Sequence, residues 1–488
     1  MQRETVSKLI VKYVMSFIEG VGRDQQTLFP EVLDDYIPAD HPVRFIDAYV
    51  DSLDLAMLGF DRATAADTGR PGYDPADLLK LYVYGYVGGI CSSRKLERET
   101  VRNIEVLWLI RKLHPDFKTI AEFRRKNIAA MPALFREFTI LCKKLDLFGA
   151  ELVAIDGSKF RAVNSKKRNY SRPMLEEILQ AVDERITNYL QRTEAADRTD
   201  AEAAGAEIDR SEELKRLKGR ATEVRSMLAE LDATGETQIS LTDRDSRTMK
   251  VRVGTDVCYN AQTAVDEKYK LIVAAEVTNE PTDRNWLSRM AVEAKQAVGA
   301  ESLAVVADKG YSSAREVEAC LEANITPYLP KPETSANKAL GLFTKNDFRY
   351  DAERDLYVCP AGQELTFRHA AHEQGRDIRY YRTYACRHCP LRPRCTRNTQ
   401  SRRISRSANE HVLEQMNKRV AAHPEILRRR KAIVEHPFGT IKRWMNQAYF
   451  LTRGLNSVRG EFSLSALAYN LKRVLSIVGV PALLAAIA

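Results

Sequence analysis

Two short stretches decide the fold that this sequence predicts: Val153-Ala154-Ile155-Asp156-Gly157-Ser158-Lys159 and Val305-Val306-Ala307-Asp308-Lys309-Gly310-Tyr311. Each is an apolar run of strand composition that ends at an aspartate, and a glycine follows within two residues. A strand end holds a side chain rigidly, and a glycine lets backbone or ligand approach closely. We therefore expect Asp156 to end one strand and Asp308 another, as two fixed carboxylates of one site.

The sequence around these stretches predicts alternating strands and helices. Strands are expected at 151–155, 256–264, 271–277, 302–307 and 325–329, with helices at 283–298 and 314–323. Three strands followed by helix, strand, helix and strand is the order of a ribonuclease-H-like core. The predicted fold class is therefore α/β, a mixed sheet flanked by helices over residues 147–171 and 236–330. Helices in 401–488 are expected to complete this core.

Residues 15–146 predict an all-helical domain. Asp74-Pro75 has the composition of a helix start, with a capping aspartate and a proline in the first turn. The two helices expected after it carry six basic residues, Arg94, Lys95, Arg98, Arg102, Arg124 and Arg125. Short helices at this spacing are compatible with a helix-turn-helix that enters a DNA groove. Many small helical bundles have the same pattern.

A first insert, residues 172–235, has no strand pattern. Its apolar residues recur at alternating steps of three and four, from Leu175 to Tyr189 and again from Leu214 to Leu231. This heptad spacing predicts two helices in an antiparallel hairpin. Such a hairpin is expected to be structural, and it is also a candidate for dimerisation.

A second insert, residues 331–400, contains four of the eight cysteines, Cys359, Cys386, Cys389 and Cys395. In a cytosolic chain this spacing favours a tetrahedral zinc site over disulfides, and His388 could replace one thiolate. The alternative is four reduced cysteines without metal. The other four cysteines occur singly beside apolar residues and are expected in the core.

A third carboxylate, Glu435, lies in a basic helical stretch. Residues 402–443 contain 11 Lys and Arg against 4 Asp and Glu. Two Mg²⁺ or Mn²⁺ ions held by Asp156, Asp308 and Glu435 would suit in-line attack on a phosphodiester, since carboxylate oxygens are hard ligands. The candidate phosphate contacts around this centre are Lys159, Lys309, Arg428, Lys431 and Lys442. The alternative for the basic stretch is a solvated helical face.

The composition is that of a soluble globular chain of 488 residues, 44% apolar and 29% charged, with a formal charge of +9. No apolar run reaches the roughly 18 residues of a membrane span, and the first residues lack a signal peptide's apolar segment. We expect a cytoplasmic protein that does not enter membranes. The positive charge suits a polyanionic partner.

As a set, these motifs resemble those of bacterial insertion-sequence transposases of the Asp-Asp-Glu type, in particular the insertion-sequence 1182 family. The resemblance rests on 15–20, Arg70-Pro71-Gly72-Tyr73, Asp156-Gly157-Ser158, Asp308-Lys309-Gly310-Tyr311, the Cys386–Cys395 cluster and 435–442. It implies recognition of terminal inverted repeats by the helical region, and strand cleavage and transfer into target DNA by the core. Related transposases carry a Tyr–Arg–Glu–Lys signature, whose Tyr and Arg positions hold Arg428 and Lys431 here.

The resemblance begins at Met15, so residues 1–14 are expected to be an extension upstream of the working start. A homodimer on double-stranded DNA is the expected assembly. Two alternatives stay open from sequence: a catalytically inactive, transposase-derived DNA-binding protein, and a ribonuclease-H-like nuclease without strand transfer.

Overall fold

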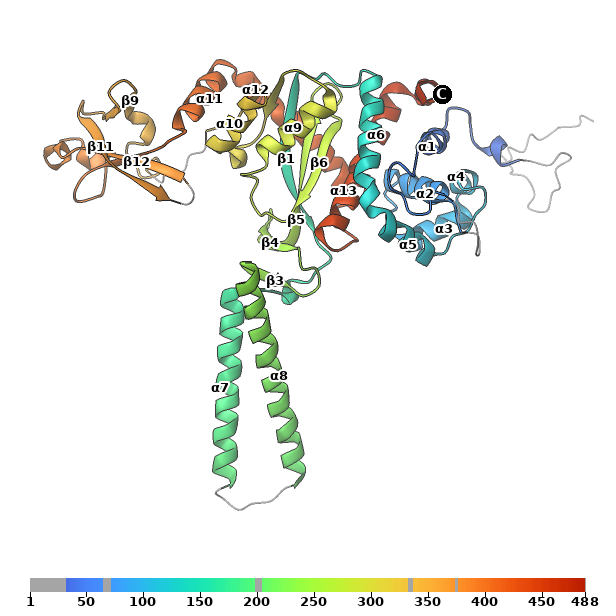
Figure 1. Ribbon diagram of the computed structural model, residues 1–488, viewed down its shortest axis with the longest axis horizontal. Coiled ribbons are helices and arrows are strands. Elements are labelled where there is room, and N and C mark those ends of the chain that lie inside the picture. The colour runs from blue at the N-terminus through green and yellow to red at the C-terminus, as the bar shows by residue number, and fades with distance from the viewer. Residues whose placement is uncertain (1–31, 65–71, 198–203, 332–336, 374–375, 488) are drawn as a thin grey trace, which may run out of the picture.

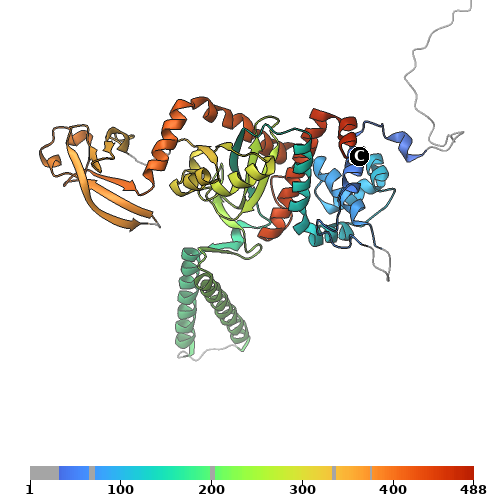
Figure 2. The ribbon, with the colours of Figure 1, turned by 45° about the horizontal axis from the view of Figure 1, so that its top comes forward.

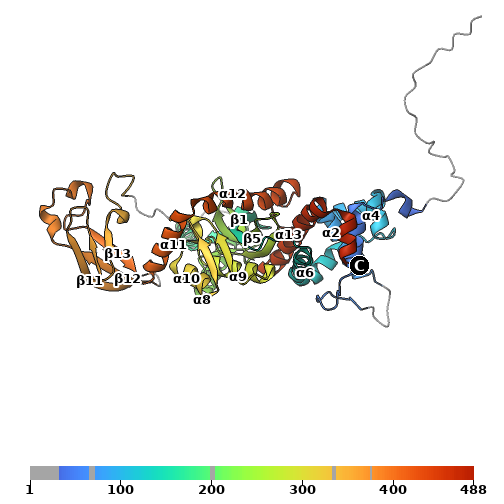
Figure 3. The ribbon, with the colours of Figure 1, turned by 90° about the horizontal axis from the view of Figure 1, so that it is seen from above.

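The computed structural model describes residues 32–64, 72–197, 204–331, 337–373 and 376–487. The expected extension at 1–14 lies outside these residues. A helical region, a central α/β body and a small β domain follow one another along the long axis, and a helical hairpin projects from the central body (Figures 1 and 2). The view from above shows the same row, with the β domain and the helical region at opposite ends (Figure 3).

The N-terminal region is helical. Its helices are α1 (Pro42–Asp51), α2 (Pro75–Val87), α3 (Ser93–Arg102), α4 (Ile104–Leu109), α5 (Phe117–Asn127) and α6 (Met131–Lys144). The predicted start of α2 is confirmed, because the Asp74 carboxylate accepts a hydrogen bond from the Ala76 amide at 2.8 Å. The buried residues of these helices and of the central sheet belong to one continuous apolar core. The region therefore packs against the core as part of one body.

The central sheet confirms the predicted mixed α/β class. Its strands are β1 (Leu152–Arg161), β4 (Arg247–Lys250), β5 (Thr255–Asp266), β6 (Ile272–Thr278), β7 (Leu303–Val306) and β8 (Ile325–Tyr328). The order is β4-β5-β1-β7-β8, and β6 also pairs with β5. β5 lies antiparallel to β1, whereas β7 and β8 continue the sheet in parallel. Helices α9 (Leu287–Val298) and α10 (Ala314–Glu322) connect the later strands.

Two predicted boundaries in this sheet are wrong. β1 does not end at Asp156 but continues to Arg161, because the long strand β5 pairs with it as far as Cys258. On its other side β1 pairs with β7 only up to Ala154. The helix expected from residue 283 begins at Leu287, so Asp283 lies in the connection that precedes α9.

The first insert contains α7 (Arg172–Asp197) and α8 (Ala204–Thr234), where the apolar spacing predicted two helices. They pack through small apolar clusters of their own, including Leu175, Val182, Leu217 and Val224. Strands β2 (Asn169–Ser171) and β3 (Gln238–Ser240) pair at the base of the hairpin. The hairpin therefore has a core separate from that of the main body.

The cysteine-bearing region is a small β domain. Its five antiparallel strands are β9 (Arg349–Asp351), β10 (Leu356–Val358), β11 (Glu364–Glu373), β12 (Arg376–Arg382) and β13 (Arg403–Ser407). One face covers a core that includes Phe348, Tyr357, Leu365, Tyr381 and Ile404. Since β13 belongs to this sheet, the domain extends past the predicted end at residue 400.

The C-terminal part is helical. It comprises α11 (Glu410–Ala422), α12 (Pro424–Gly439), a π-helical turn (Thr440–Trp444), α13 (Leu455–Val478) and α14 (Val480–Ile487). α13 is buried over most of its length and contacts α2, α6 and β6. Among the described helices, no single one is long and apolar enough to cross a membrane; α13 and α14 pass that test only together, across a 110° bend.

Candidate active site

The two predicted aspartates are brought to adjacent strands of the sheet. The last residue of β1 that pairs with β7 is Ala154, opposite Val306. Two residues further along each chain stand Asp156 and Asp308, so the parallel register places them side by side. Both are half-buried. The sequence prediction that these carboxylates share one site agrees with this register.

The environment of Asp156 disfavours its ionised form. Burial raises the pKa of Asp156 to about 6, and the neighbouring Asp308 and Asp283 carboxylates add to the rise. The Arg430 guanidinium opposes it, with Nη1 at 3.4 Å from the Asp156 Oδ2 atom. A cation that replaced the proton would therefore be favoured electrostatically at this position.

Asp308 is held by the turn that follows β7. Its carboxylate caps the turn Lys309–Tyr311 by accepting a hydrogen bond from the Gly310 amide at 2.7 Å. Tyr311 is buried, and its hydroxyl donates to the Gln262 side chain. The conserved direction of the turn is thus fixed by one capping bond and one buried anchor, which leaves the second carboxylate oxygen of Asp308 free of this cap.

Helix α12 lies across the sheet on its buried apolar residues, which include Ile433, Val434 and Phe438. It continues through Pro437 into the π-helical turn. Its Arg430 faces Asp156, whereas Glu435 points elsewhere. The Glu435 carboxylate lies 3.8 Å from the Lys431 ammonium, and their side chains are 63% and 76% exposed. The structure therefore brings arginine, and not the predicted third carboxylate, against Asp156.

Lys442 returns to the sheet from the π-helical turn. Its ammonium donates to the Ser158 hydroxyl at 2.6 Å and to the Lys159 carbonyl at 2.8 Å, and lies 4.3 Å from the centre of the Phe160 ring. Burial lowers the pKa of Lys442 to about 8. This cation stands two residues along β1 from Asp156, within the candidate site.

A further carboxylate, Asp283, was missed in the sequence. It accepts hydrogen bonds from the Asn260 and Gln262 amides at 2.6 and 2.7 Å, and the Lys159 ammonium lies at 3.5 Å. The cluster fills the space beside Gly157: a Cβ there would stand 2.5 Å from Gln262 Nε2 and 2.6 Å from Asp283 Oδ1. The signal that could have found Asp283 is an aspartate between the third strand and the following helix.

The arrangement as it stands is not a complete metal site. Within the described ranges, no group of three or more His, Cys, Asp or Glu side chains is close enough to hold an ion. The hard oxygen donors of Asp156 and Asp308 nevertheless fit Mg²⁺ or Mn²⁺ chemically. Of the predicted three ligands, the structure brings these two together.

The predicted DNA contacts of the N-terminal helices differ in exposure. Arg94, Lys95, Arg98 and Arg102 are exposed on α3. Arg102 pairs with Glu99 and Arg125 with Glu122, each at 2.5 Å, but both arginines remain largely exposed. Arg124 instead turns inward, donates to the Cys91 carbonyl at 3.4 Å and lies over the Tyr82 ring. Its guanidinium therefore serves the packing of the helices in this structure.

The other predicted phosphate contacts surround the site. Lys309 and Arg428 are exposed, and Lys159 is half-buried beside Asp283. Arg429, between Arg428 and Arg430, pairs with Glu267 of the central body. The basic run of α12 thus pairs with acids of the core and not with the acidic hairpin.

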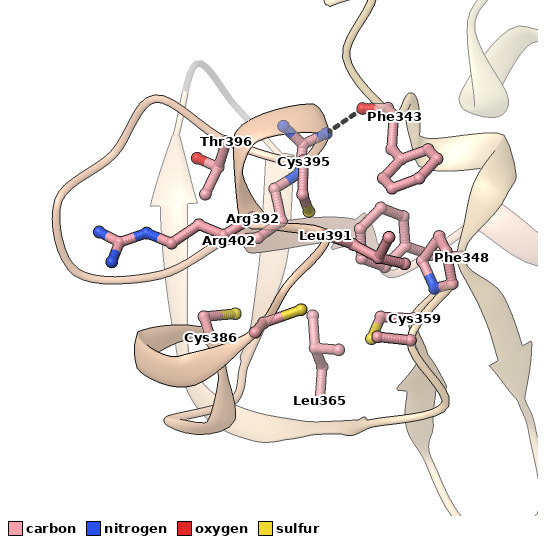
Figure 4. Close-up of a pocket in the computed structure, with 13 residues that line it drawn as sticks. Phe343, Phe348, Cys359, Leu365, Cys386, Leu391, Arg392, Cys395, Thr396 and Arg402 are labelled. Atoms are coloured by element: carbon pink, nitrogen blue, oxygen red, sulfur yellow. Dashed lines mark hydrogen bonds between the residues drawn. The ribbon is translucent and has the colours of Figure 1, made fainter.

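The four predicted zinc-binding cysteines line one pocket of the β domain (Figure 4). Cys359 follows β10, Cys386 and Cys389 border a short turn, and Cys395 follows a second turn. Burial raises the pKa of the Cys395 thiol, and the three neighbouring thiols add to the effect. All four thiols are free, and in this conformation no three of these described side chains form a metal-ligating group.

Comparison with known proteins identifies two stretches of the chain. Residues 358–475 match the family described as "Transposase DDE domain". Residues 31–126 match the family described as "Transposase domain (DUF772)". A search of curated proteins found no match.

Among solved structures, the chain is similar to a piggyBac transposase in a synaptic complex with hairpin DNA. The identity is 10%, the TM-score is 0.30, and the match covers 90% of this chain and 76% of that one. A TM-score this low carries no argument about the present fold. The family matches do: the chain contains a transposase DDE domain that includes α12 with Glu435, and a transposase domain in its helical region.

Proposed function

We propose that this protein is an Asp-Asp-Glu transposase of a bacterial insertion sequence, which cuts the ends of its element and joins them to target DNA. The observation that carries the proposal is the pair Asp156 and Asp308 on adjacent strands beneath α12, the helix of the DDE-domain match. A ribonuclease-H-like core and membership of the insertion-sequence 1182 family are parts of this proposal.

In this proposal Asp156, Asp308 and Glu435 hold two Mg²⁺ or Mn²⁺ ions. Bound ions of this kind activate the attacking oxygen and stabilise the leaving oxygen of a phosphodiester. For Glu435 to join the two aspartates, it must give up its exposed ion pair with Lys431, which costs little in high dielectric. Arg430 now compensates the Asp156 charge and would be free to contact a phosphate once cations take over that role.

Lys442 and the exposed basic side chains position the DNA. The Lys442 ammonium is fixed by Ser158 and by the Lys159 carbonyl, so its charge stands beside the strand that carries Asp156. Lys309, Arg428 and Lys431 offer further phosphate contacts around the same site. Phosphate contacts orient a duplex without reading its sequence. Recognition of the inverted repeats is assigned to α3, with Arg94, Lys95, Arg98 and Arg102.

The proposed assembly is a homodimer that holds two element ends, in the cytoplasm. The test is an assay with end DNA, a target plasmid and Mg²⁺. A transposase yields cut ends and joined products. Cut ends without joined products favour the nuclease, and binding without cutting favours the inactive DNA-binding protein, for which the Arg430–Asp156 ion pair is the supporting observation.

We also propose that Cys359, Cys386, Cys389 and Cys395 bind one zinc ion. Four thiols around one pocket are the donor set of a structural zinc site. Metal analysis of protein purified without chelator should give about one zinc per chain, and Cys386→Ser should lower that content. Wild-type protein without zinc would reduce the cluster to packed thiols.

A further inference from the structure

The β domain carries a concentration of arginine that the proposed reaction does not use. Residues 376–407 contain ten arginines and one acidic residue, Asp377, and no lysine. This segment of the chain therefore has a local charge of +9, as large as the net charge of all 488 residues. A surface of this kind repels itself unless acids or a polyanion compensate it.

The arginines divide between the two faces of the sheet. On the core side, Arg379 pairs with Asp355 at 2.6 Å and Arg406 with Glu414 at 2.5 Å. Arg382 and Arg403 stand opposite each other on β12 and β13, and alternate with the core residue Tyr381. They therefore belong to the outer face.

Aromatic rings hold the outer arginines in place. The Arg403 guanidinium lies 4.3 Å from the centre of the Tyr380 ring, and His369 stacks on the same ring. Arg368 and Arg382 lie 4.8 and 5.6 Å from the centre of the Tyr384 ring. A guanidinium stacked on a ring keeps its N–H groups at its edge available to an anion. The outer face is thus a preformed set of donors.

These outer cations lack acidic partners. Among the described residues, no carboxylate forms an ion pair with Arg368, Arg382 or Arg403, nor with Arg387, Arg394 and Arg397 in the adjoining turns. Of these, only Arg382 is half-buried, donating to Ser401 and Gln400, and the others are exposed. We define this set as the arginine face.

We propose that the arginine face is a second DNA-binding surface, which contacts the phosphate backbone of a duplex. The inference rests on the proposed function for its partner. Guanidinium groups match phosphate in two-point geometry, and the set contains arginine without lysine. The rings lie under the arginines, and Tyr380 is only 5% exposed, so stacking of single-stranded bases is disfavoured.

The position of the face adds a second argument. The β domain and the helical region lie at opposite ends of the molecule, with the candidate site between them (Figures 1 and 3). A duplex held at both ends would pass the central body. The arginine face would then supply affinity without sequence choice, while α3 supplies recognition.

The test measures binding of the full-length protein to a mixed-sequence duplex at several salt concentrations. The variants are Arg368→Gln, Arg403→Gln and the double variant. The matched control is Arg354→Gln, in the same domain, whose exposed side chain is paired with Glu364. Each lost phosphate contact should flatten the log–log salt slope by ~0.9. The control should keep the wild-type slope, and Arg403→Lys, which keeps the charge, should keep it too.

A double variant with the slope of the control would overturn the inference. So would tighter binding of single-stranded RNA than of duplex, or loss of self-association in the double variant at unchanged slope, which would assign the face to a second copy of the chain. Arg368→Gln carries the test if the double variant unfolds, because Arg368 packs only on the exposed Tyr384 ring. If wild-type protein cuts end DNA while the double variant keeps its slope, this inference fails and the proposed function stands.

Discussion

The glycine of Asp156-Gly157-Ser158 owes its place to the cluster behind it. A Cβ at Gly157 would stand 2.5 Å from Gln262 Nε2, 2.6 Å from Asp283 Oδ1 and 3.0 Å from Asn260 Oδ1. These atoms cannot move freely, because the two amides donate to the same Asp283 carboxylate. The glycine therefore couples the catalytic strand to a polar cluster on its other face.

We expect Gly157→Ala to lower the free energy of unfolding by about 1–3 kcal/mol, as overpacking does. DNA cleavage should fall with it, because β1 carries Asp156. The control is Gly219→Ala on α8, where a Cβ meets nothing within 4 Å. That change should stabilise the hairpin helix by up to about 1 kcal/mol. Denaturant unfolding of both variants checks the pair, and equal stability changes would contradict the account.

The raised pKa of Asp156 predicts a pH-dependent stability. Its folded pKa of about 6 lies above the ordinary value of 3.8. The stability that the group contributes is therefore full below pH 3.8 and is lost as the pH rises through about 6. In metal-free protein, the difference in unfolding free energy between wild type and Asp156→Asn should shrink over this window.

Mg²⁺ should reverse that trend, since it competes with the proton. The rise in Tm on adding Mg²⁺ should be larger above pH 7 than below pH 5, and absent in Asp156→Asn. A rise in Tm that is equal at both pH values would show that the ion binds elsewhere.

At the scale of elements, the hairpin α7–α8 is the part most separable from the rest. Its apolar clusters are distinct from the main core. Two ion pairs join it to the connection before β4: Arg244 with Glu230, and Arg247 with Glu236.

We expect a chain in which a short linker joins β2 directly to β3 to retain a cooperative unfolding transition. Its unfolding free energy should change by less than about 2 kcal/mol, because ion pairs of this type contribute at most about 1 kcal/mol each. Calorimetry of the shortened chain tests this. Loss of the main transition would show that the hairpin supports the core, and loss of dimers alone would assign it to self-association.

The elements also show where sequence reasoning reaches its limit. Apolar runs sufficed for β7, β8 and the hairpin helices, because their pattern is local. The true length of β1 depends on its pairing with β5, a partner about a hundred residues away along the chain that the local pattern does not contain. The sheet of the β domain was missed because its strands are short or exposed: β11 has eight of ten residues exposed.

The site shows the same division. Asp156 and Asp308 could be predicted from strand ends followed by glycine. Asp283 could not, because its role depends on amides of β5 that face it only in the folded sheet. Arg430 was predicted only as part of a basic run, since its contact with Asp156 depends on the rotation of α12 about its axis.

At the scale of the whole molecule, the account assigns one task to each part of the row. The helical region recognises the element ends, the central body cuts and joins, and the β domain adds backbone affinity. The weakest point of this account is the third carboxylate, because Glu435 is exposed and paired with Lys431.

The most direct test is Mg²⁺-dependent cleavage of a plasmid that carries the element ends by Glu435→Gln. The matched control is Glu425→Gln, an exposed glutamate in the first turn of the same helix. The account predicts that Glu435→Gln folds and binds DNA like wild type but does not cleave, while Glu425→Gln cleaves normally. Wild-type cleavage by Glu435→Gln would contradict the Asp-Asp-Glu centre proposed here.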